Sequence, residues 1–242
     1  MHIGLLLWSI LPGLLWAHWL YKRDAFQPEP LGLVLRAFII GMLLTAPAIY
    51  FSSHIRALPS LDPAVVGTDW VWAFKTSFLV TGPLEEGLKF AAVYFFFFHH
   101  RDFDEPIDGL VYTGTVALGF ASAENIVYLT HYGPEVIVLR ALLSVPAHFL
   151  FAASIGYAMG LRVAPSSPEA SPRRIRPPWD LAAGLLAAVL AHGAYNFALL
   201  LGSHHQEPLW GWGGALLTLG TLSFLWQYYV RELDEISPFR PD

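Results

Sequence analysis

The sequence predicts an all-α, polytopic membrane protein, a bundle of about seven transmembrane helices with a range of six to eight. Two observations lead to this fold class. The chain of 242 residues is 55% hydrophobic and only 14% charged, whereas a soluble domain carries about 25% charged residues. Its apolar residues also gather in runs of about 20, the helix length that crosses a hydrocarbon core roughly 30 Å thick. The runs lack the period-two alternation of a membrane β-barrel.

The apolar runs follow one another along the whole chain, mostly with short connections. Two connections are longer. Residues 53–69 form an outer loop rich in turn formers, and residues 163–178 form a Pro/Ser/Arg-rich inner linker that we expect to be mobile. Neither resembles a domain, so residues 1–242 are predicted to be a single transmembrane helical domain. The predicted spans are 3–21, 31–52, 70–98, 107–131, 135–162, 180–201 and 210–230.

The basic residues indicate how the bundle is oriented. With the N-terminus outside, the outer loops keep only Arg56 as a clear basic residue, and the other loops carry the excess of Lys and Arg that is typical of the inner side. The first run is followed, not preceded, by its positive charges, so we interpret it as a retained anchor and not as a cleaved signal peptide. The inner basic residues are Lys22, Arg23, Arg101, Arg162, Arg173, Arg174, Arg176, Arg231 and Arg240.

Composition also excludes several classes of chemistry and partner. There is no cysteine, so the chain has neither a disulfide nor a thiolate nucleophile or ligand. The formal charge is -5, and no basic tract with interleaved aromatic residues suggests nucleic acid. The lipid bilayer is the partner that the sequence does predict.

Ionisable residues lie deep inside four of the predicted spans. Glu85 and Glu86, His148, and His192 fall within a turn of the middle of their spans. Glu124 lies about 7 Å outward of its helix centre at 1.5 Å per residue. An ionisable residue at the midplane costs roughly 2.5 to 3.5 kcal/mol on insertion scales, so five of them at similar depth favour a function.

Helical periodicity places these residues on faces that pack against other helices. His148 shares a face with Ser144 and Gly156, and His192 shares one with Gly184 and Asn196. Small residues at this spacing let helices approach closely. We therefore expect the ionisable groups to point into a catalytic bundle formed by about residues 70–201.

Each residue also has a purely structural interpretation. Glu85 or Glu86 with Lys89 would form a buried ion pair at helical spacing. His148 and His192 would be core histidines, and Asn125 and Asn196 would hydrogen-bond between helices. Glu124 has no obvious local cation. The shared depth and the shared small-residue faces favour one common site over separate structural roles.

Carboxylates and imidazoles together suit amide hydrolysis. A carboxylate general base can activate water, while imidazoles or a metal stabilise the oxyanion of the attacked carbonyl. An alternative from another class is a proton- or cation-coupled membrane transporter that uses midplane Glu and His residues. A non-catalytic binding or scaffold protein is a third alternative.

The same residues carry a resemblance to a known family. The ordered set is E-E-x-x-K (Glu85, Glu86, Lys89), F-x-x-x-E-N (Phe120, Glu124, Asn125), an isolated His148, and H-x-x-x-N (His192, Asn196). Tyr21-Lys22-Arg23-Asp24, Pro28-Glu29-Pro30 and Asp108-Gly109 add to it. Over about residues 20–200 the chain resembles the PrsW family of intramembrane proteases. The resemblance implies a multi-pass protein of the bacterial inner or plasma membrane that acts as a peptidase.

The resemblance extends to the related CAAX prenyl endopeptidases and implies roles for the site. Glu85 would be the base that activates water, with Glu86 as a supporting or alternate carboxylate, and His192 and Asn196 would hold the oxyanion. Lys89 and Asn125 would support the site. The chain departs from the CAAX pattern at Glu124, which stands where a His is found and cannot donate a hydrogen bond unless protonated.

Two catalytic types therefore stay open. In the glutamic type, Glu85 or Glu86 deprotonates water and no cofactor is needed. In the metal type, Glu124, His148 and His192 bind a divalent metal, Zn²⁺ by its ligand preference, and Glu85 or Glu86 is the base. Either type needs water and an unwound substrate, which we expect to be a membrane protein or a membrane-bound peptide cut in the outer half. Gly82, Pro83 and Pro146 would loosen the helices near the site.

Overall fold

The computed structural model describes residues 3–24, 27–163, 179–204, 208–235 and 237, and these residues form helices and no strand. This confirms the predicted all-α class. Elements η1 and η2 are π-helical and continuous with their neighbours, so residues 70–96 and 135–160 each form one interrupted helix. In chain order the elements are α1 (Ile3–Tyr21), α2 (Leu31–Arg56), α3 (Pro63–Val66), α4 (Trp70–Phe74), η1 (Lys75–Thr81), α5 (Gly82–Phe96), α6 (Asp108–Tyr132), α7 (Glu135–Leu139), η2 (Arg140–Ser144), α8 (Val145–Gly160), α9 (Trp179–His204) and α10 (Pro208–Glu235).

Each predicted span coincides with a helix, and the largest difference is that α10 continues to Glu235. The described residues contain five helices long and apolar enough to cross a membrane: Gly4–Tyr21, Leu31–Arg56, Asp108–Tyr132, Glu135–Gly160 and Asp180–Ser203. A polytopic membrane protein is thereby confirmed. The helix over residues 70–96 carries four charged residues, and α10 is less apolar than the five candidate spans, so the count of seven spans stays a prediction. The outer position of the N-terminus also stays a prediction.

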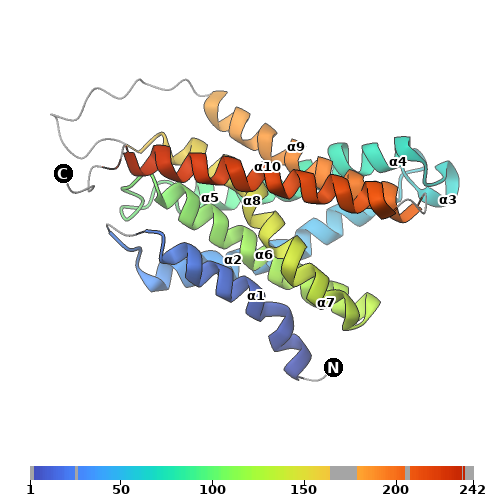
Figure 1. Ribbon diagram of the computed structural model, residues 1–242, viewed down its shortest axis with the longest axis horizontal. Coiled ribbons are helices and arrows are strands. Elements are labelled where there is room, and N and C mark those ends of the chain that lie inside the picture. Colours follow the sequence, from blue (N-terminus) through green and yellow to red (C-terminus); the bar gives the residue numbers. More distant parts are fainter. Residues whose placement is uncertain (1–2, 25–26, 164–178, 205–207, 236, 238–242) are drawn as a thin grey trace.

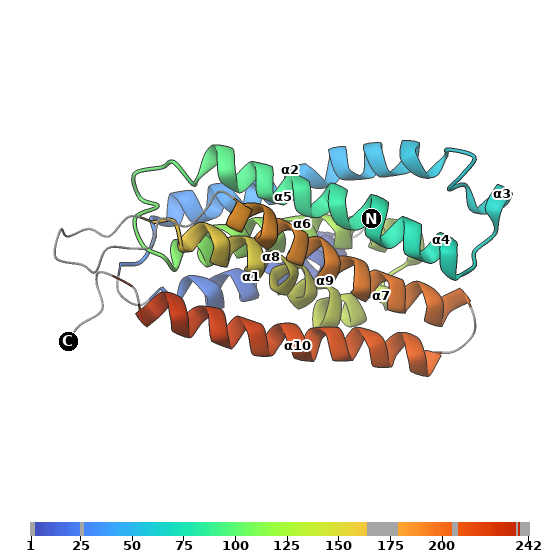
Figure 2. The ribbon, with the colours of Figure 1, turned by 90° about the horizontal axis from the view of Figure 1, so that it is seen from above.

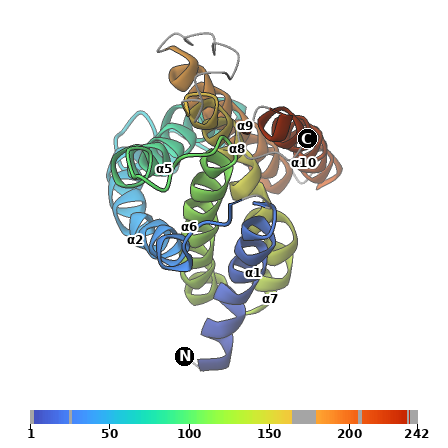
Figure 3. The same cartoon turned by 90° about the vertical axis from the view of Figure 1, so that its left-hand side faces the viewer.

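Helix α6 is the centre of the bundle. Most of its side chains are buried, and it packs against α1, α2 and α8. Seen along the long axis, α6 lies between α2 and α1, with α8, α9 and α10 above it (Figure 3). Close backbone approach requires glycine here: a Cβ on Gly41 of α2 would lie 2.0 Å from the carbonyl oxygen of Val116 in α6. The small residues of these helices thus let the backbones pack tightly in a molecule whose outer surface is apolar.

The connections lie at two opposite ends of the bundle (Figures 1 and 2). One end holds the α1–α2 and α5–α6 connections, and the other holds α3, α4 and α7. The outer loop expected at 53–69 is more ordered than predicted, because α2 continues to Arg56 and Asp62 caps the short helix α3. Of the linker expected at 163–178, only Val163 lies within the described residues. The single-domain assignment and the boundaries of the catalytic bundle stay predictions.

A π-helical stretch precedes each of two prolines. Pro83 and Pro146 lie at the start of α5 and α8, directly after η1 and η2. A proline cannot donate to the carbonyl four residues earlier and its ring collides with that carbonyl, so the preceding turn widens. The wider turns lie just before Glu85 and His148, which are two residues beyond their prolines.

Candidate active site

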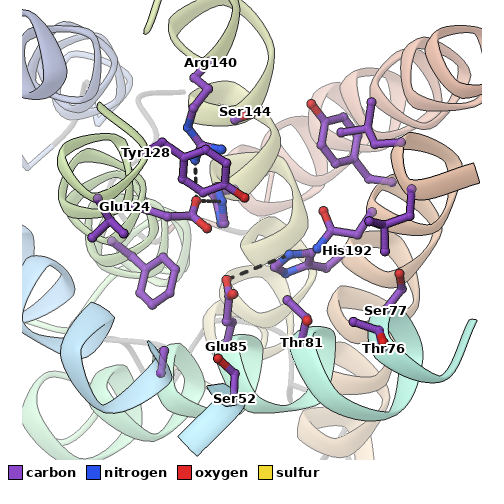
Figure 4. A pocket seen from close by; sticks show the side chains of 18 of the residues that line it. Ser52, Thr76, Ser77, Thr81, Glu85, Glu124, Tyr128, Arg140, Ser144 and His192 are labelled. Atoms are coloured by element: carbon purple, nitrogen blue, oxygen red, sulfur yellow. Dashed lines mark hydrogen bonds and ion pairs between the residues drawn. The ribbon is translucent and has the colours of Figure 1, made fainter. Parts of the chain in front are cut away.

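The predicted convergence of ionisable residues occurs in the structure. Helix α5 supplies Glu85 and Glu86, α6 supplies Glu124, α8 supplies His148, and α9 supplies His192. Apart from Glu86, these side chains line one pocket of about 630 Å³. Figure 4 shows Glu85 and His192 facing each other across it, with Glu124 on another wall. Four helices far apart in the sequence therefore build one polar site.

One chain of buried contacts runs from Lys89 through Glu86 to His192. The Nζ of Lys89 donates to Oε1 of Glu86 at 2.7 Å, and Nδ1 of His192 donates to the same oxygen at 2.8 Å. Lys89 and Glu86 are fully buried and His192 is 2% exposed. With Nδ1 donating, the Nε2 atom of a neutral His192 carries a lone pair and can bind a proton or a metal. Glu86 therefore fixes the ring of His192.

His148 is held at both ring nitrogens. Lys89 lies 3.0 Å from Nδ1, and Glu124 Oε2 lies 3.0 Å from Nε2. Because an ammonium group has only donors, Nδ1 must accept, and Nε2 then donates its proton to Glu124. Lys89 thus joins two branches of the site, one through Glu86 to His192 and one through His148 to Glu124.

Glu124 has a strong cation partner that the sequence analysis missed. Arg140 in η2 donates from Nη2 to Oε2 of Glu124 at 2.5 Å and from Nε to Asn125 at 2.8 Å. The guanidinium also lies 3.7 Å from the ring centre of Tyr128. Asn125 in turn donates to the backbone oxygen of Ser9 at 3.2 Å, so it links helices as in its purely structural interpretation. The expectation that Glu124 lacks a local cation is therefore corrected.

The sequence did not indicate Arg140 as the partner of Glu124, because the two residues are 16 positions apart and lie on different helices. The available signal was Arg140 itself, which lies within the fifth predicted span, where a charge is costly without a partner. Arg140 begins η2, and its side chain contacts Asn125 of α6.

Glu85 is the pocket carboxylate that has no hydrogen-bond partner among the described residues. Its Oε2 is buried and accepts no hydrogen bond, and it lies 3.9 Å from Nε2 of His192, too far for a direct bond. The charges around Glu85 also indicate that no cation is paired with it. Lys89 and Arg140 balance Glu86 and Glu124, which leaves the charge of Glu85 to be balanced by a proton or a bound cation.

Comparison with known proteins decides the family. Residues 29–226 match the family described as "PrsW family intramembrane metalloprotease". The chain belongs to the PrsW family. Protease PrsW of Geobacillus kaustophilus is 34% identical over 227 residues, which are 94% of this chain and 89% of the relative. Protease PrsW of Bacillus subtilis is 35% identical over 224 residues, 93% and 91% of the two chains. No solved structure matches.

Membership of the PrsW family confirms several predictions. The protein is an intramembrane protease, a peptidase that acts on a protein substrate in a membrane. Its apolar helices and its relatives place it in the bacterial cell membrane as a multi-pass protein. The family decides for proteolysis over the transporter and scaffold alternatives, and it leaves the catalytic type open.

The donors present suit the metal that the PrsW description implies. One ligand atom each from Glu85, His148 and His192 lie within 4.8 Å of one another, and all three residues are buried. Two histidines and a carboxylate are a common catalytic zinc set, and two ligands about 2.1 Å from one ion are separated by up to roughly 4.2 Å. The 3.9 Å between Glu85 and His192 meets that limit. His148 would have to release one of its present partners to join them.

This set differs from the predicted ligands Glu124, His148 and His192. Glu124 is occupied by Arg140 and His148, whereas Glu85 has a free oxygen. Asn196, the other predicted supporting residue, lines the pocket one turn along α9 from His192. Phe151 stacks on the ring of His192 with the centroids 4.7 Å apart, which gives the polar site an apolar wall.

Proposed function

We propose that this PrsW-family protease cleaves peptide bonds with Glu85 as the general base. The observation that carries the proposal is the unpartnered Oε2 of Glu85, buried in the pocket and facing Nε2 of His192 at 3.9 Å. A water molecule fits between two acceptors at this separation, since each hydrogen bond of about 2.8 Å allows up to roughly 5.6 Å. Every other carboxylate of the site already accepts from a cation.

Each step then has a residue that can perform it. Glu85 takes one proton from the water, the water oxygen bonds to the substrate carbonyl carbon, and the carbonyl oxygen becomes negative. When the C–N bond breaks, Glu85 returns the proton to the leaving nitrogen. Asn196, on the same wall as His192, supports the oxyanion by donating its amide hydrogens. Glu86 and Lys89 hold His192 and do not touch the substrate.

The metal type uses the same side chains. Glu85, His148 and His192 would hold a Zn²⁺ ion, which supplies a lower pKa to bound water and polarises a carbonyl oxygen. Glu124 then orients His148, as carboxylates that accept from metal-ligating histidines do. The ligand set predicted with Glu124 is the alternative, and metal content in variants separates the two.

The pocket favours an extended segment of a membrane protein or membrane-bound peptide as the substrate. A transmembrane helix hides its carbonyl groups in its own hydrogen bonds, so a cleavable segment must be unwound. The pocket reaches from the ionisable cluster to Arg56, the last residue of α2, and to His131 and Tyr132, the last residues of α6, at the ends of these helices predicted to be outer. Polar side chains along this path, such as Thr76 and Ser77, bear buried hydroxyls without a partner and can bind substrate backbone.

The test is cleavage of a labelled single-span protein by purified enzyme in detergent or vesicles. Substitution of the base by glutamine, Glu85→Gln, keeps the shape of the side chain and removes the base, so kcat should fall about 10²–10⁴-fold. Glu86→Gln should also lower kcat, because the His192 ring loses the carboxylate that holds it. His192→Ala should lower kcat because the ring is absent. Glu135→Gln and His99→Ala, at exposed positions outside the pocket, are the matched controls.

Bound metal is measured on the same samples. In the metal type, zinc is present in the wild type and falls in Glu85→Gln and His192→Ala, while Glu124→Gln retains it. Loss with Glu124→Gln and retention with Glu85→Gln would support the other ligand set. Full proteolysis by Glu85→Gln would refute its role as the base.

A further inference from the structure

The motifs at residues 21–24, 28–30 and 108–109 do not line the pocket, and their acidic residues lie close together elsewhere. Asp24 follows α1, Glu29 precedes α2, and Asp108 begins α6. One carboxylate oxygen from each lies within 4.8 Å of the other two. Asp108 is 16 residues from Glu124 along α6, about 24 Å at 1.5 Å per residue. This acidic cluster is therefore a second site at the opposite end of the central helix.

The cluster is built by specific hydrogen bonds. Asp24 accepts from the backbone N–H of Glu29 at 3.0 Å, and Asp108 accepts from the backbone N–H of Glu105 at 2.6 Å. The hydroxyl of Tyr112 donates to Glu29. Asp24 is 2%, Glu29 3% and Asp108 0% exposed. These contacts hold the carboxylates toward one another despite their like charge.

Within the described residues, no basic side chain pairs with these acids. The charged groups that act on them are other carboxylates, including Glu105 and Asp104. A buried group of acids with no cation needs bound protons or a bound ion.

Unpartnered oxygens point to an ion. No N–H or hydroxyl group of the described residues donates to the buried Oδ1 of Asp108, and the Asp108 carboxyl group lies within hydrogen-bond reach of that of Glu29. One shared proton would join only the carboxyl groups of Asp108 and Glu29, whereas a cation uses the free lone pairs of all three acids at once.

We propose that Asp24, Glu29 and Asp108 bind one hard divalent cation of the Mg²⁺ or Ca²⁺ class. Carboxylate oxygens are the ligands that these ions prefer, and the absence of imidazole or thiolate donors from the cluster distinguishes it from the catalytic site. Two oxygens about 2.3–2.6 Å from one Ca²⁺ ion are separated by up to roughly 5 Å, which the 4.8 Å limit meets. The ion joins the end of α1 and the α1–α2 connection to the start of α6.

Mn²⁺ is the probe, because it takes oxygen ligands and its binding is counted by electron paramagnetic resonance. The double variant Glu85→Gln/His192→Ala removes donors of the catalytic site, so one Mn²⁺ per chain should remain bound in it. Adding Asp108→Asn or Glu29→Gln should weaken that binding at least tenfold. Asp102→Asn, partly exposed and paired with Arg101, is the matched control. Competition with Mg²⁺ and with Ca²⁺ shows which ion is preferred.

Thermal unfolding gives a second measurement that does not depend on Mn²⁺. At a cation concentration about 100 times Kd, the Tm of the double variant should rise by roughly 5 °C, and the rise should be absent after Asp108→Asn. Retention of Mn²⁺ by the Asp108→Asn and Glu29→Gln variants, or complete loss of Mn²⁺ from Glu85→Gln/His192→Ala, would overturn the proposal. If the Tm is the same after Asp108→Asn and added cations do not change it, the acids share protons and the proposal is overturned. Neither result depends on proteolysis, so the protease assignment is tested separately.

Discussion

The ion pair between Arg140 and Glu124 should be a main determinant of stability around the pocket. The perturbation is Arg140→Met, which keeps a long unbranched side chain and removes the charge. Arg140 and Glu124 are 11% and 18% exposed, and their closest N···O distance is 2.5 Å. After the substitution, the bond from His148 is the one hydrogen bond that Glu124 retains within the described part of the chain.

The magnitude follows from that burial. Removing one partner of a buried pair costs about 3 kcal/mol or more, since the remaining charge has neither water nor a partner. For a chain of this size this corresponds to a fall of ~6–12 °C in Tm. Glu124→Gln should cost less, about 1–2 kcal/mol, because Arg140 keeps Asn125 and the ring of Tyr128.

The assay is thermal unfolding of purified protein in one detergent, for the two single variants and for Arg140→Met/Glu124→Gln. The double variant should be more stable than the sum of the single effects by about 2 kcal/mol, because no unpaired charge is left. Arg56→Gln, whose side chain bonds Ser52 near the protein surface, is the control and should change Tm little. Additive single effects, or an Arg140→Met variant as stable as the wild type, would refute the reasoning.

Three further outcomes follow from the same structure. Glu85→Gln should leave Tm unchanged or raise it while proteolysis falls, because a buried carboxylate without a hydrogen-bond partner becomes a neutral amide; a lower Tm in unfolding scans would contradict this. Gly41→Ala should destabilise by about 1–3 kcal/mol, since its Cβ would meet the Val116 carbonyl at 2.0 Å, whereas Gly32→Ala, with open space around it, should not; equal Tm values for the two would count against the tight α2–α6 packing. Incubation with a chelator should release zinc and stop cleavage if the site is of the metal type, and zinc should restore both; activity that persists in metal-free enzyme would favour the glutamic type.

The helices were predictable because the bilayer leaves the backbone few alternatives. An apolar run of about 20 residues must satisfy its own N–H and C=O groups, so runs such as 3–21 and 107–131 become helices nearly where the sequence indicates. The identity of the ionisable residues was predictable for a related reason. A charge at such depth is costly, so Glu85, His148 and His192 were candidates before any contact was known.

The partner of each charged group was not predictable to the same extent. Helical spacing offers Lys89 both Glu85 and Glu86, and only the packed bundle shows that Lys89 bonds Glu86 and leaves Glu85 free. The missed partner Arg140 begins the π-helical element η2 and contacts Glu124 on another helix. Such a turn shifts every later residue around the helix axis, and periodicity assumes that it is absent.

The sequence by itself determined an apolar helical membrane protein with acids and imidazoles at one depth, because spans and their polar residues are local properties of each run. The tertiary structure decided which of those groups are paired, and it brought together Asp24, Glu29 and Asp108 from distant connections. Contacts between residues so far apart depend on how whole helices pack and rotate against one another, which no single run of residues specifies.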